Sequence, residues 1–559
     1  MKFSRIARPL AVLLAAFFAV SLIAPPANAL DRISGNGSSW AGNAINQWVT
    51  DVKAQGQTVD YTPDGSSSGR KNFATGLSDF AISEIPFKGD TADKQDTNFP
   101  NFAYSMLPVV AGGTSFMYNL QVGGKRLQNL RLSQDTLAAI FSGDITQWND
   151  KAIAATNPGV ALPAQRITVV VRSDGSGATA QFTLWMLRKF PQRYASLCAK
   201  AKCDPSAATS YFPYQNISNF TAQSGSNGVT TYTTNTPFTI NYDEFSYAKG
   251  VGFPVAQIQN AAGFYTIPTD SAVAVALTQA QINKDKNSLN YLSQDLSKVY
   301  GHGDPRTYPI SAYSYMIAPA QLQGNFSNNK GAALANFAAY SLCEGQRTMG
   351  SLGYSPLPMN LVLDAMDQVR KIPGIDAGTL AKLEATTKSV STSAGNPCNN
   401  PTFKPGDDPQ VNQLVRTAPF PEGCDAKCQA PWSKVNAAVN GGGAGGPAPA
   451  GPGAGDKPAA GGTGAAATDA KPDDAAAAQT DATECDPETG LCATGGQKAG
   501  TGAGQAAVAN PIVLAGTNGW GSKETMLVVA CVFAVAFLLV PPLIFRMTSS
   551  PRTRRRNGQ

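Results

Sequence analysis

Apolar and polar positions along residues 30–375 alternate between two kinds of pattern. Short runs rich in β-branched and aromatic residues predict strands, whereas apolar residues three or four positions apart predict helices. The predicted strands are 107–110, 114–118, 168–171 and 308–317, and the predicted helices are 42–53, 134–141, 179–190 and 332–343. This alternation predicts an α/β fold with helices packed on sheets, and about 345 residues are enough for two lobes.

The first 29 residues have the pattern of a secretory signal peptide. Lys2, Arg5 and Arg8 precede an apolar run over residues 10–23, and the segment ends in the small residues of 27–29. A basic start, an apolar middle and an A-x-A end predict export and cleavage. An uncleaved N-terminal anchor is the alternative, but the apolar run is short for a membrane span.

The carboxyl end predicts a membrane anchor. Residues 525–545 form a 21-residue stretch without a charge, which is long enough to cross a hydrocarbon core of roughly 30 Å. Five arginines follow within 546–559, and such a cluster places that side in the cytoplasm. The chain is therefore expected in the cell membrane as a single-pass protein, with its bulk outside and residues 546–559 as a basic cytoplasmic tail. A buried core helix is the alternative.

Residues 376–524 separate the patterned region from this anchor. In 441–480, 30 of 40 residues are Gly, Ala or Pro, and no aromatic residue is present. Such a segment cannot bury enough apolar surface to form a core, so residues 441–524 are predicted to be a disordered tether. Residues 376–440 form an extension that contains cysteines and a predicted helix at 377–390.

Cysteine usage agrees with export. Eight of the nine cysteines, all except Cys531, precede the predicted span, and an even number suits disulfides. Three pairs are close in sequence, with one pair as the remainder: Cys198/Cys203, Cys424/Cys428, Cys485/Cys492 and Cys343/Cys398. Zinc binding is the rival interpretation, but no histidine lies nearby and no spacing is C-x-x-C. The sequence does not fix the connectivity.

Charge and histidine content exclude several function classes. The chain carries a net charge of +6, but the signal peptide contributes +3 and the cytoplasmic tail +5, which leaves −2 for residues 30–545. No nucleic-acid partner is therefore expected. With His302 as the single histidine, we expect no multi-histidine metal site and no cofactor. No activated nucleophile is visible either, so an enzyme is not expected.

Three segments rich in glycine and serine each follow a strand-like run and precede a predicted helix. They are residues 34–40, 64–69 and 172–177. The second is expected to open a helix with Phe73 and Leu77 on its inner face. A helix N-terminus offers unpaired N–H groups and about half a positive charge, so three of them together predict a site for a small anion. Taken singly, the first two segments are more typical of a turn followed by an N-cap.

Arg172 makes the third segment more specific, because a guanidinium group suits a phosphate or a carboxylate. The nucleotide-binding patterns G-x-x-x-x-G-K-[ST] and G-x-G-x-x-G are absent from these three segments. A small tetrahedral anion therefore fits these segments better than a nucleotide.

The order of four short motifs resembles one family closely. They are G-x-G-[ST]-[ST]-aromatic at 35–40, G-S-S-x-G at 65–69, S-[DE]-x-P at 83–86 and R-x-D-G-S-G at 172–177, with supporting stretches at 140–150, 240–248 and 352–358. The series is similar to the substrate-binding protein of the phosphate-specific (Pst) ABC transporter. The resemblance implies a two-lobed periplasmic-binding-protein type II fold with the ligand in the cleft between the lobes.

The resemblance also implies which residues hold phosphate. Ser39 and the backbone of Trp40 would contribute from the first segment, and Ser66 from the second. The remaining phosphate contacts would come from the S-[DE]-x-P motif and from the third segment with the residue after it. They are Glu84, Arg172, Asp174, Ser176, Gly177 and Ala178. Arg172 would make the charged contact, oriented by Asp174. Glu84 stands where the family usually has Asp, and Ala178 where it has a hydroxyl residue.

Glu84 would select the ligand. A carboxylate beside a bound anion is repulsive unless the anion carries a proton, which phosphate does at neutral pH and sulfate does not. A carboxylate in a surface or hinge salt bridge is the simpler alternative for Glu84.

The leading hypothesis is a membrane-tethered receptor that binds inorganic phosphate and delivers it to ABC transporter permease subunits. A surface sensor or adhesion protein that retains the phosphate-binding fold without transport is the alternative. A phosphatase ranks third, because Ser176 has no candidate base at motif spacing.

Overall fold

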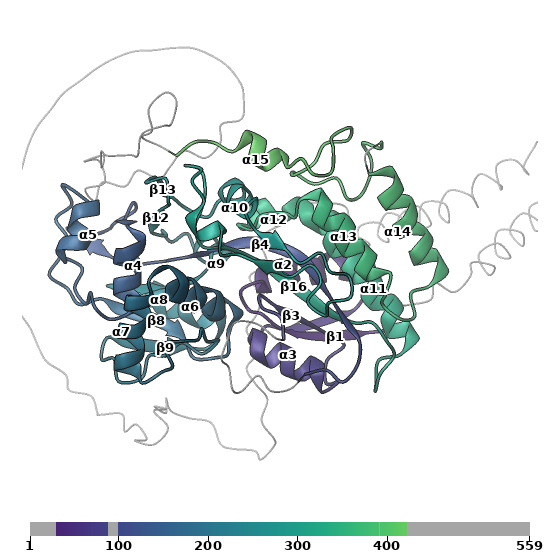
Figure 1. Cartoon of the computed structure of the whole chain (residues 1–559), viewed down its shortest axis with the longest axis horizontal. Helices are drawn as coiled ribbons and strands as arrows, with labels where there is room; N and C mark the ends of the chain where they lie inside the picture. The colour runs from purple at the N-terminus through teal and green to yellow at the C-terminus, as the bar shows by residue number, and fades with distance from the viewer. Residues whose placement is uncertain (1–29, 88–98, 391, 422–559) are drawn as a thin grey trace, which may run out of the picture. The chain divides into compact units, whose positions relative to one another are not determined.

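The computed structural model describes residues 30–87, 99–390 and 392–421 (Figure 1). The predicted signal peptide, the tether at 441–524, the predicted membrane span at 525–545 and the cytoplasmic tail all lie outside these residues. Among the helices that are described, none has the length and apolar character of a membrane span.

The larger sheet has six strands in the order β11-β4-β16-β3-β1-β2. The strands are β1 (Ile33–Gly37), β2 (Val59–Thr62), β3 (Phe80–Ser83), β4 (Tyr104–Ser115), β11 (Asp243–Glu244) and β16 (Ser311–Pro319). β1 runs parallel to β2 and β3, whereas β16 runs antiparallel to β3 and β4. Every residue of β3, β4 and β16 is buried, so these three adjacent strands lie in the interior of the protein.

The long strand β4 corrects one detail of the sequence prediction. Two runs, 107–110 and 114–118, were expected with a gap at Gly112 and Gly113, but one strand spans Tyr104–Ser115. A Cβ atom on Gly112 would lie 2.7 Å from the ring of Trp40, and one on Gly113 would lie 2.3 Å from Pro268. The two glycines therefore allow close packing on the sheet and do not mark a turn.

Helices pack against this sheet along most of its strands. α3 (Ser66–Ala74) packs on β1 and β3, α13 (Met359–Val369) and α9 (Phe245–Gly250) pack on β4, and α10 (Asp270–Leu277) packs on β4 and β16. α2 (Gly42–Ala54) packs on β2, and α11 (Asn328–Leu342) packs on α2 and α13. The predicted helices 42–53 and 332–343 correspond to α2 and α11. Leu77 is an error of the prediction: α3 ends at Ala74, and Leu77 is 75% exposed beyond it.

A second sheet has three parallel strands in the order β10-β8-β9. They are β8 (Thr168–Arg172), β9 (Phe220–Gln223) and β10 (Thr239–Asn241). The helices α4 (Gln134–Phe141), α6 (Gly177–Lys189), α7 (Pro191–Ala201) and α8 (Gly225–Asn235) lie around it (Figure 1). Its core is aromatic: the ring of Phe182 lies within 5.5 Å, between centroids, of Phe116, Phe141, Trp185 and Tyr242. This confirms the α/β class.

Short elements complete the described chain. The sheet β13-β12-β7 consists of β7 (Arg131–Leu132), β12 (Gln257–Gln259) and β13 (Tyr265–Thr266). Two hairpins pair β5 (Gln121–Val122) with β6 (Lys125–Arg126) and β14 (Gln281–Ile282) with β15 (Gln294–Asp295). The remaining helical segments are α5 (Lys151–Thr156), η1 (Val299–Gly301), η2 (Glu344–Thr348) and α12 (Met349–Leu352).

The described part of the extension, residues 376–421, packs on the same core as the larger sheet. α14 (Ala377–Ser389), which matches the predicted helix 377–390, lies against α11 and α13. Leu383 and Phe403 are buried in that core. α15 (Gln413–Thr417) lies against α10, and Arg306 donates to the carbonyl of Val415 at 3.0 Å.

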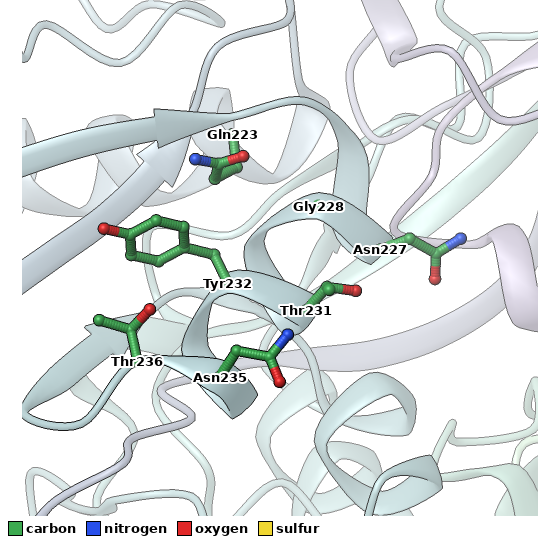
Figure 2. A pocket seen from close by; sticks show the side chains of 7 residues that line it. All are labelled: Gln223, Asn227, Gly228, Thr231, Tyr232, Asn235 and Thr236. Carbon is green, nitrogen blue, oxygen red and sulfur yellow. The ribbon is translucent and has the colours of Figure 1, made fainter. Parts of the chain in front are cut away.

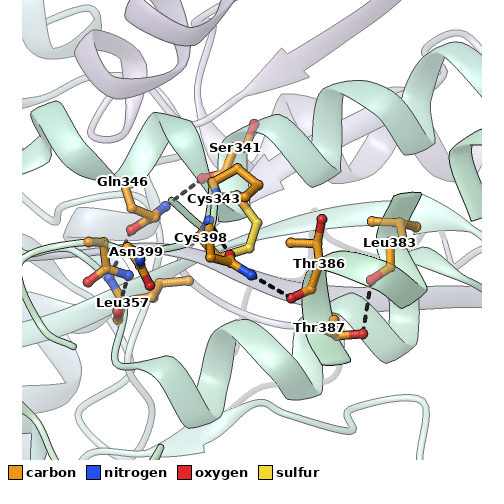
Figure 3. The surroundings of a disulfide bond; sticks show 12 residues. Ser341, Cys343, Gln346, Leu357, Leu383, Thr386, Thr387, Cys398 and Asn399 are labelled. Carbon is orange, nitrogen blue, oxygen red and sulfur yellow. Dashed lines mark hydrogen bonds between the residues drawn. A yellow bond between two sulfur atoms is a disulfide. The ribbon is translucent and has the colours of Figure 1, made fainter. Parts of the chain in front are cut away.

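Two disulfides lie within the described residues. One joins Cys198 to Cys203 at the end of α7, and the other joins Cys343, at the end of α11, to Cys398 (Figure 3). Both are pairings that the sequence allowed. Cys424, Cys428 and the other two predicted partners lie outside the described chain.

Replacing Cys343 and Cys398 together by serine is expected to lower the free energy of unfolding by about 4 kcal/mol, because this bridge closes the longer of the two loops formed by the described disulfides. Its two cysteines are 55 residues apart, against 5 for Cys198 and Cys203. The matched double variant at Cys198 and Cys203 should lose only about 2 kcal/mol. Denaturant titration of the oxidised proteins measures both losses, and equal losses would contradict the loop-length argument.

Candidate functional site

The three segments that the sequence singles out lie at the N-termini of α2, α3 and α6. Each follows the end of a strand, namely β1, β2 and β8. The first loop is shorter than expected, because 34–37 belongs to β1: Gly35 lies against the ring of Phe80, where a Cβ atom would come within 2.2 Å. Gly37 ends the strand with a φ of 133°, which favours glycine.

Several backbone N–H groups at these helix starts have no protein acceptor. Within the described chain, no hydrogen bond is donated by the N–H groups of Ser39, Trp40, Ser66, Gly177 and Ala178. All five residues are buried. Buried N–H groups are rarely left without an acceptor, so these helix starts have the free donors that an anion would need.

Arg172 is the centre of the first cluster of side chains. It ends β8 and is 1% exposed. Its Nε donates to Oδ1 of Asp174 at 2.9 Å, and its Nη2 donates to the other carboxylate oxygen. Nη2 also donates to the hydroxyl of Ser39 at 2.7 Å. The other terminal nitrogen of the guanidinium group, Nη1, lies 3.8 Å from Oδ2 of Asp243. One cation therefore connects β8, the first segment and β11.

The charges in this cluster stabilise one another. Burial lowers the pKa of Arg172, but Asp174 and Asp243 outweigh burial, so the net shift is upward. Burial raises the pKa of Asp174, but Arg172 outweighs it, so this carboxyl titrates below its usual range. Asp174 also accepts the N–H of Gly225, the first residue of α8, at 2.8 Å. The resulting ion pair holds the guanidinium in one orientation.

Glu84 is the centre of the second cluster. Its side chain is 2% exposed and accepts three serine hydroxyls. Ser66 donates to Oε2 at 2.8 Å, Ser314 of β16 donates to Oε1 at 2.9 Å, and Ser38 also donates to Oε1. No cation pairs with Glu84 among the described residues. Hydroxyl donors therefore solvate this carboxylate.

The second and third segments are in direct contact at Gly177. A Cβ atom there would lie 2.1 Å from Oε2 of Glu84 and 2.7 Å from the hydroxyl of Ser66. The N–H of Ser67 donates to the carbonyl of Gly175 at 3.0 Å. These contacts connect the larger sheet to the three-stranded sheet, and they require a residue without a side chain at position 177.

Three of the nine residues from the resemblance contribute backbone or packing in the structure. The indole of Trp40 packs against Tyr354 in the core, with ring centroids 6.1 Å apart. Ser176 caps α6 by accepting the N–H of Thr179 at 3.3 Å. Ala178 is buried in the core. The other six residues share the two clusters: Ser39, Arg172 and Asp174 in the first, and Ser66, Glu84 and Gly177 in the second.

Four further polar residues complete the clusters, and the sequence analysis did not assign them to the site. Ser38 and Ser314 donate to Glu84, whereas Ser226 and Asp243 belong to the Arg172 cluster. Ser38 lies inside the first motif, and Asp243 lies in the supporting stretch 240–248, so both carried a signal. Ser226 and Ser314 stand in a helix and a strand with no such marker.

Two hollows lie elsewhere on the described chain. One, of about 420 Å³, follows α8 (Figure 2) and is lined by Gln223, Asn227, Gly228, Thr231, Tyr232, Asn235 and Thr236. The other, of about 340 Å³, lies between α11 and α14 and includes Tyr340, Cys343 and Leu383 in its lining. Neither of these two hollows is lined by a residue of the two clusters.

The two sheets define an α/β protein in which three helix starts lie beside two buried clusters of polar side chains. The model of the PBP superfamily domain matches residues 23–344, more than half of the chain. The chain belongs to this superfamily and, within it, to the substrate-binding proteins of the Pst phosphate transporter.

Curated relatives agree with this assignment. The chain is 30% identical over 355 residues to the phosphate-binding protein PstS of Methanocaldococcus jannaschii. The aligned residues cover 61% of this chain and 86% of the relative. It is 32% identical over 329 residues to the phosphate-binding protein PstS 3 of Mycobacterium tuberculosis, with coverages of 58% and 82%. Among solved structures, the phosphate-binding protein of Stenotrophomonas maltophilia has 19% identity and a TM-score of 0.42, with coverages of 66% and 97%.

Proposed function

We propose that the protein binds inorganic phosphate between its two main sheets. The observation that carries the proposal is the contact at Gly177, where the start of α6 meets Ser66 and Glu84. N–H groups from two helix starts and a buried carboxylate would then lie within reach of one small ligand. Phosphate is what the names of the curated relatives say those proteins bind.

The roles of the residues follow from their donors. Ser39, Ser66 and Ser176 offer hydroxyl groups, and the N–H groups of Trp40, Gly177 and Ala178 have no acceptor. Arg172 would supply the positive charge, in the orientation that Asp174 fixes. These groups are neutral donors apart from Arg172, so the ligand would be held mainly by directed hydrogen bonds.

Glu84 would distinguish phosphate from sulfate. As a buried acceptor it would face an acceptor oxygen of sulfate, whereas phosphate has a hydroxyl group to donate. The three serine hydroxyls around Glu84 hydrogen-bond its side-chain oxygens before the ligand arrives. Exchange of one of these serine donors for the phosphate hydroxyl would leave the carboxylate solvated.

The protein would act as the extracytoplasmic receptor of an ABC importer and not as an enzyme. Pst substrate-binding proteins work with permease subunits, so these subunits would be its partners. The predicted signal peptide, tether and membrane span would hold it at the outer side of the cell membrane, close to that permease. The tether would then raise the local concentration of the receptor at the permease, so that the receptor would not have to reach the permease by free diffusion.

Arg172→Ala is expected to weaken phosphate binding by roughly a hundredfold or more, because the site loses the buried cation between Ser39 and Asp243 and Asp174 loses its cationic partner. Calorimetry on the full-length chain in detergent measures the loss. Arg166→Ala is the matched control, since Arg166 is exposed and precedes the same strand. Retained affinity in Arg172→Ala would remove Arg172 from the site, and a wild-type chain that binds no phosphate would refute the proposed function.

Glu84→Gln is expected to reduce the preference for phosphate over sulfate by roughly a hundredfold or more, because an amide can donate to a sulfate oxygen. Glu84→Asp, which restores the residue usual in the family, should keep the preference. Competition of each oxyanion with radiolabelled phosphate gives the ratio. An unchanged ratio in Glu84→Gln would show that selectivity arises elsewhere.

Truncation after residue 440 is expected to release the protein from the membrane fraction, because it removes the predicted span at 525–545. Deletion of 441–480 alone is the control and should leave the chain in the membrane. Fractionation and immunoblotting of cells that express each form measure the distribution. A truncated chain that stays in the membrane would show that another segment anchors it.

A further inference from the structure

Asp243 is a second carboxylate beside Arg172, and its contacts differ from those of Asp174. It stands in β11 with its side chain 4% exposed. Oδ1 accepts the hydroxyl of Ser226 at 2.9 Å and the N–H of Glu244 at 2.7 Å. Oδ2 accepts no hydrogen bond and lies 3.8 Å from Nη1 of Arg172. Asp243 therefore acts on Arg172 through charge and not through a hydrogen bond.

The charges around Arg172 do not balance when both aspartates are ionised. Arg172 contributes one positive charge, whereas Asp174 and Asp243 contribute two negative charges. Arg172 and Asp243 are buried, and the side chain of Asp174 is 14% exposed. A bound anion would add further negative charge at the same cation. Uncompensated charge in a buried site is costly, and the usual response is uptake of a proton.

Other titratable groups face Asp243 from the neighbouring elements. Glu244 follows it in β11, Tyr242 precedes it, and Tyr247 of α9 interacts with it electrostatically. Burial raises the pKa of Glu244 well above its usual range, and burial raises the pKa of both tyrosines. A carboxyl and two phenol groups carry no positive charge in either protonation state, so none of the three supplies a compensating positive charge.

We propose that Asp243 is a positioning residue for the phosphate site that acts through Arg172 and takes up a proton when phosphate binds. This inference rests on the proposed function. When Asp243 is neutral, the positive charge of Arg172 interacts with Asp174 and the ligand alone. It also converts Oδ2 from an acceptor without a donor into a possible hydrogen-bond donor.

Asp243 titrates in a pH range in which phosphate binding can be measured. Burial raises its pKa to about 6, against the lowering effect of Arg172. A bound anion raises the pKa further, because it disfavours the charged carboxylate. The carboxyl in the bound state thus holds its proton to higher pH than in the free state. Phosphate affinity should therefore strengthen as the pH falls from 8 toward 6, and this gain should level off below the free-state pKa.

The test is the pH dependence of phosphate affinity in the full-length chain and in Asp243→Asn. The variant should bind phosphate about tenfold more tightly than the wild type at pH 8 and equally at pH 5, because asparagine mimics the protonated side chain. Calorimetry in two buffers of different ionisation enthalpy should show that the wild type takes up more protons than the variant near pH 7. Titration of phosphate itself is common to both proteins and cancels in the comparison.

Asp79→Asn is the matched control, since Asp79 is a buried aspartate paired with Lys330, and it precedes β3 at the end opposite to Glu84. It should leave the pH profile unchanged. An Asp243→Asn profile parallel to that of the wild type, or an equal loss of affinity at every pH, would overturn the inference, whereas absence of phosphate binding by the wild type would refute the proposed function instead. If Asp243→Asn does not fold, the wild-type proton count, compared with that of Asp79→Asn across pH 5–8, decides: a count explained by phosphate alone overturns the inference.

Discussion

The buried guanidinium of Arg172 is the interaction on which the rest of the site depends. An arginine cannot lose its proton in a protein, so burial obliges the chain to surround it with acceptors. Asp174 comes from the same segment, Ser39 from the loop before α2 and Asp243 from β11. Each belongs to a different part of the fold. The position of one cation therefore fixes how the three-stranded sheet meets the larger one at this point.

Glu84 organises the opposite side of the site by different means. It lacks a cationic partner among the described residues and is stabilised by hydroxyl groups from three segments. Hydroxyl groups can rotate and exchange partners, whereas an ion pair with two parallel hydrogen bonds cannot without large cost. The Arg172 cluster is therefore the rigid half of the site, and the Glu84 cluster is the adaptable half. Gly177 lies where the two halves touch.

Sequence patterns predicted the fold class, most helix bounds and the local parts of the site. Arg172 and its partner Asp174 are two residues apart in the sequence, so a single motif contained both. The bond from Ser314 to Glu84 spans 230 residues, and no local pattern marks either end of such a contact. Leu77 shows the limit on the smaller scale: its spacing fits the inner face of α3, but the helix ends before the spacing applies. Long-range pairing and exact helix ends depend on tertiary packing, which periodicity does not encode.

The bridge between Cys343 and Cys398 has a mechanical consequence. Force applied to the chain on the carboxyl side of Cys398 passes through sulfur to the end of α11, and from there to the core on which α11 packs. α14 lies between the two cysteines in sequence and is bypassed by this route. Pulling can therefore peel away only α15 and the loops that follow Cys398 before the load reaches the central core. In a protein held by its carboxyl end, the folded body would resist pulling without losing α14.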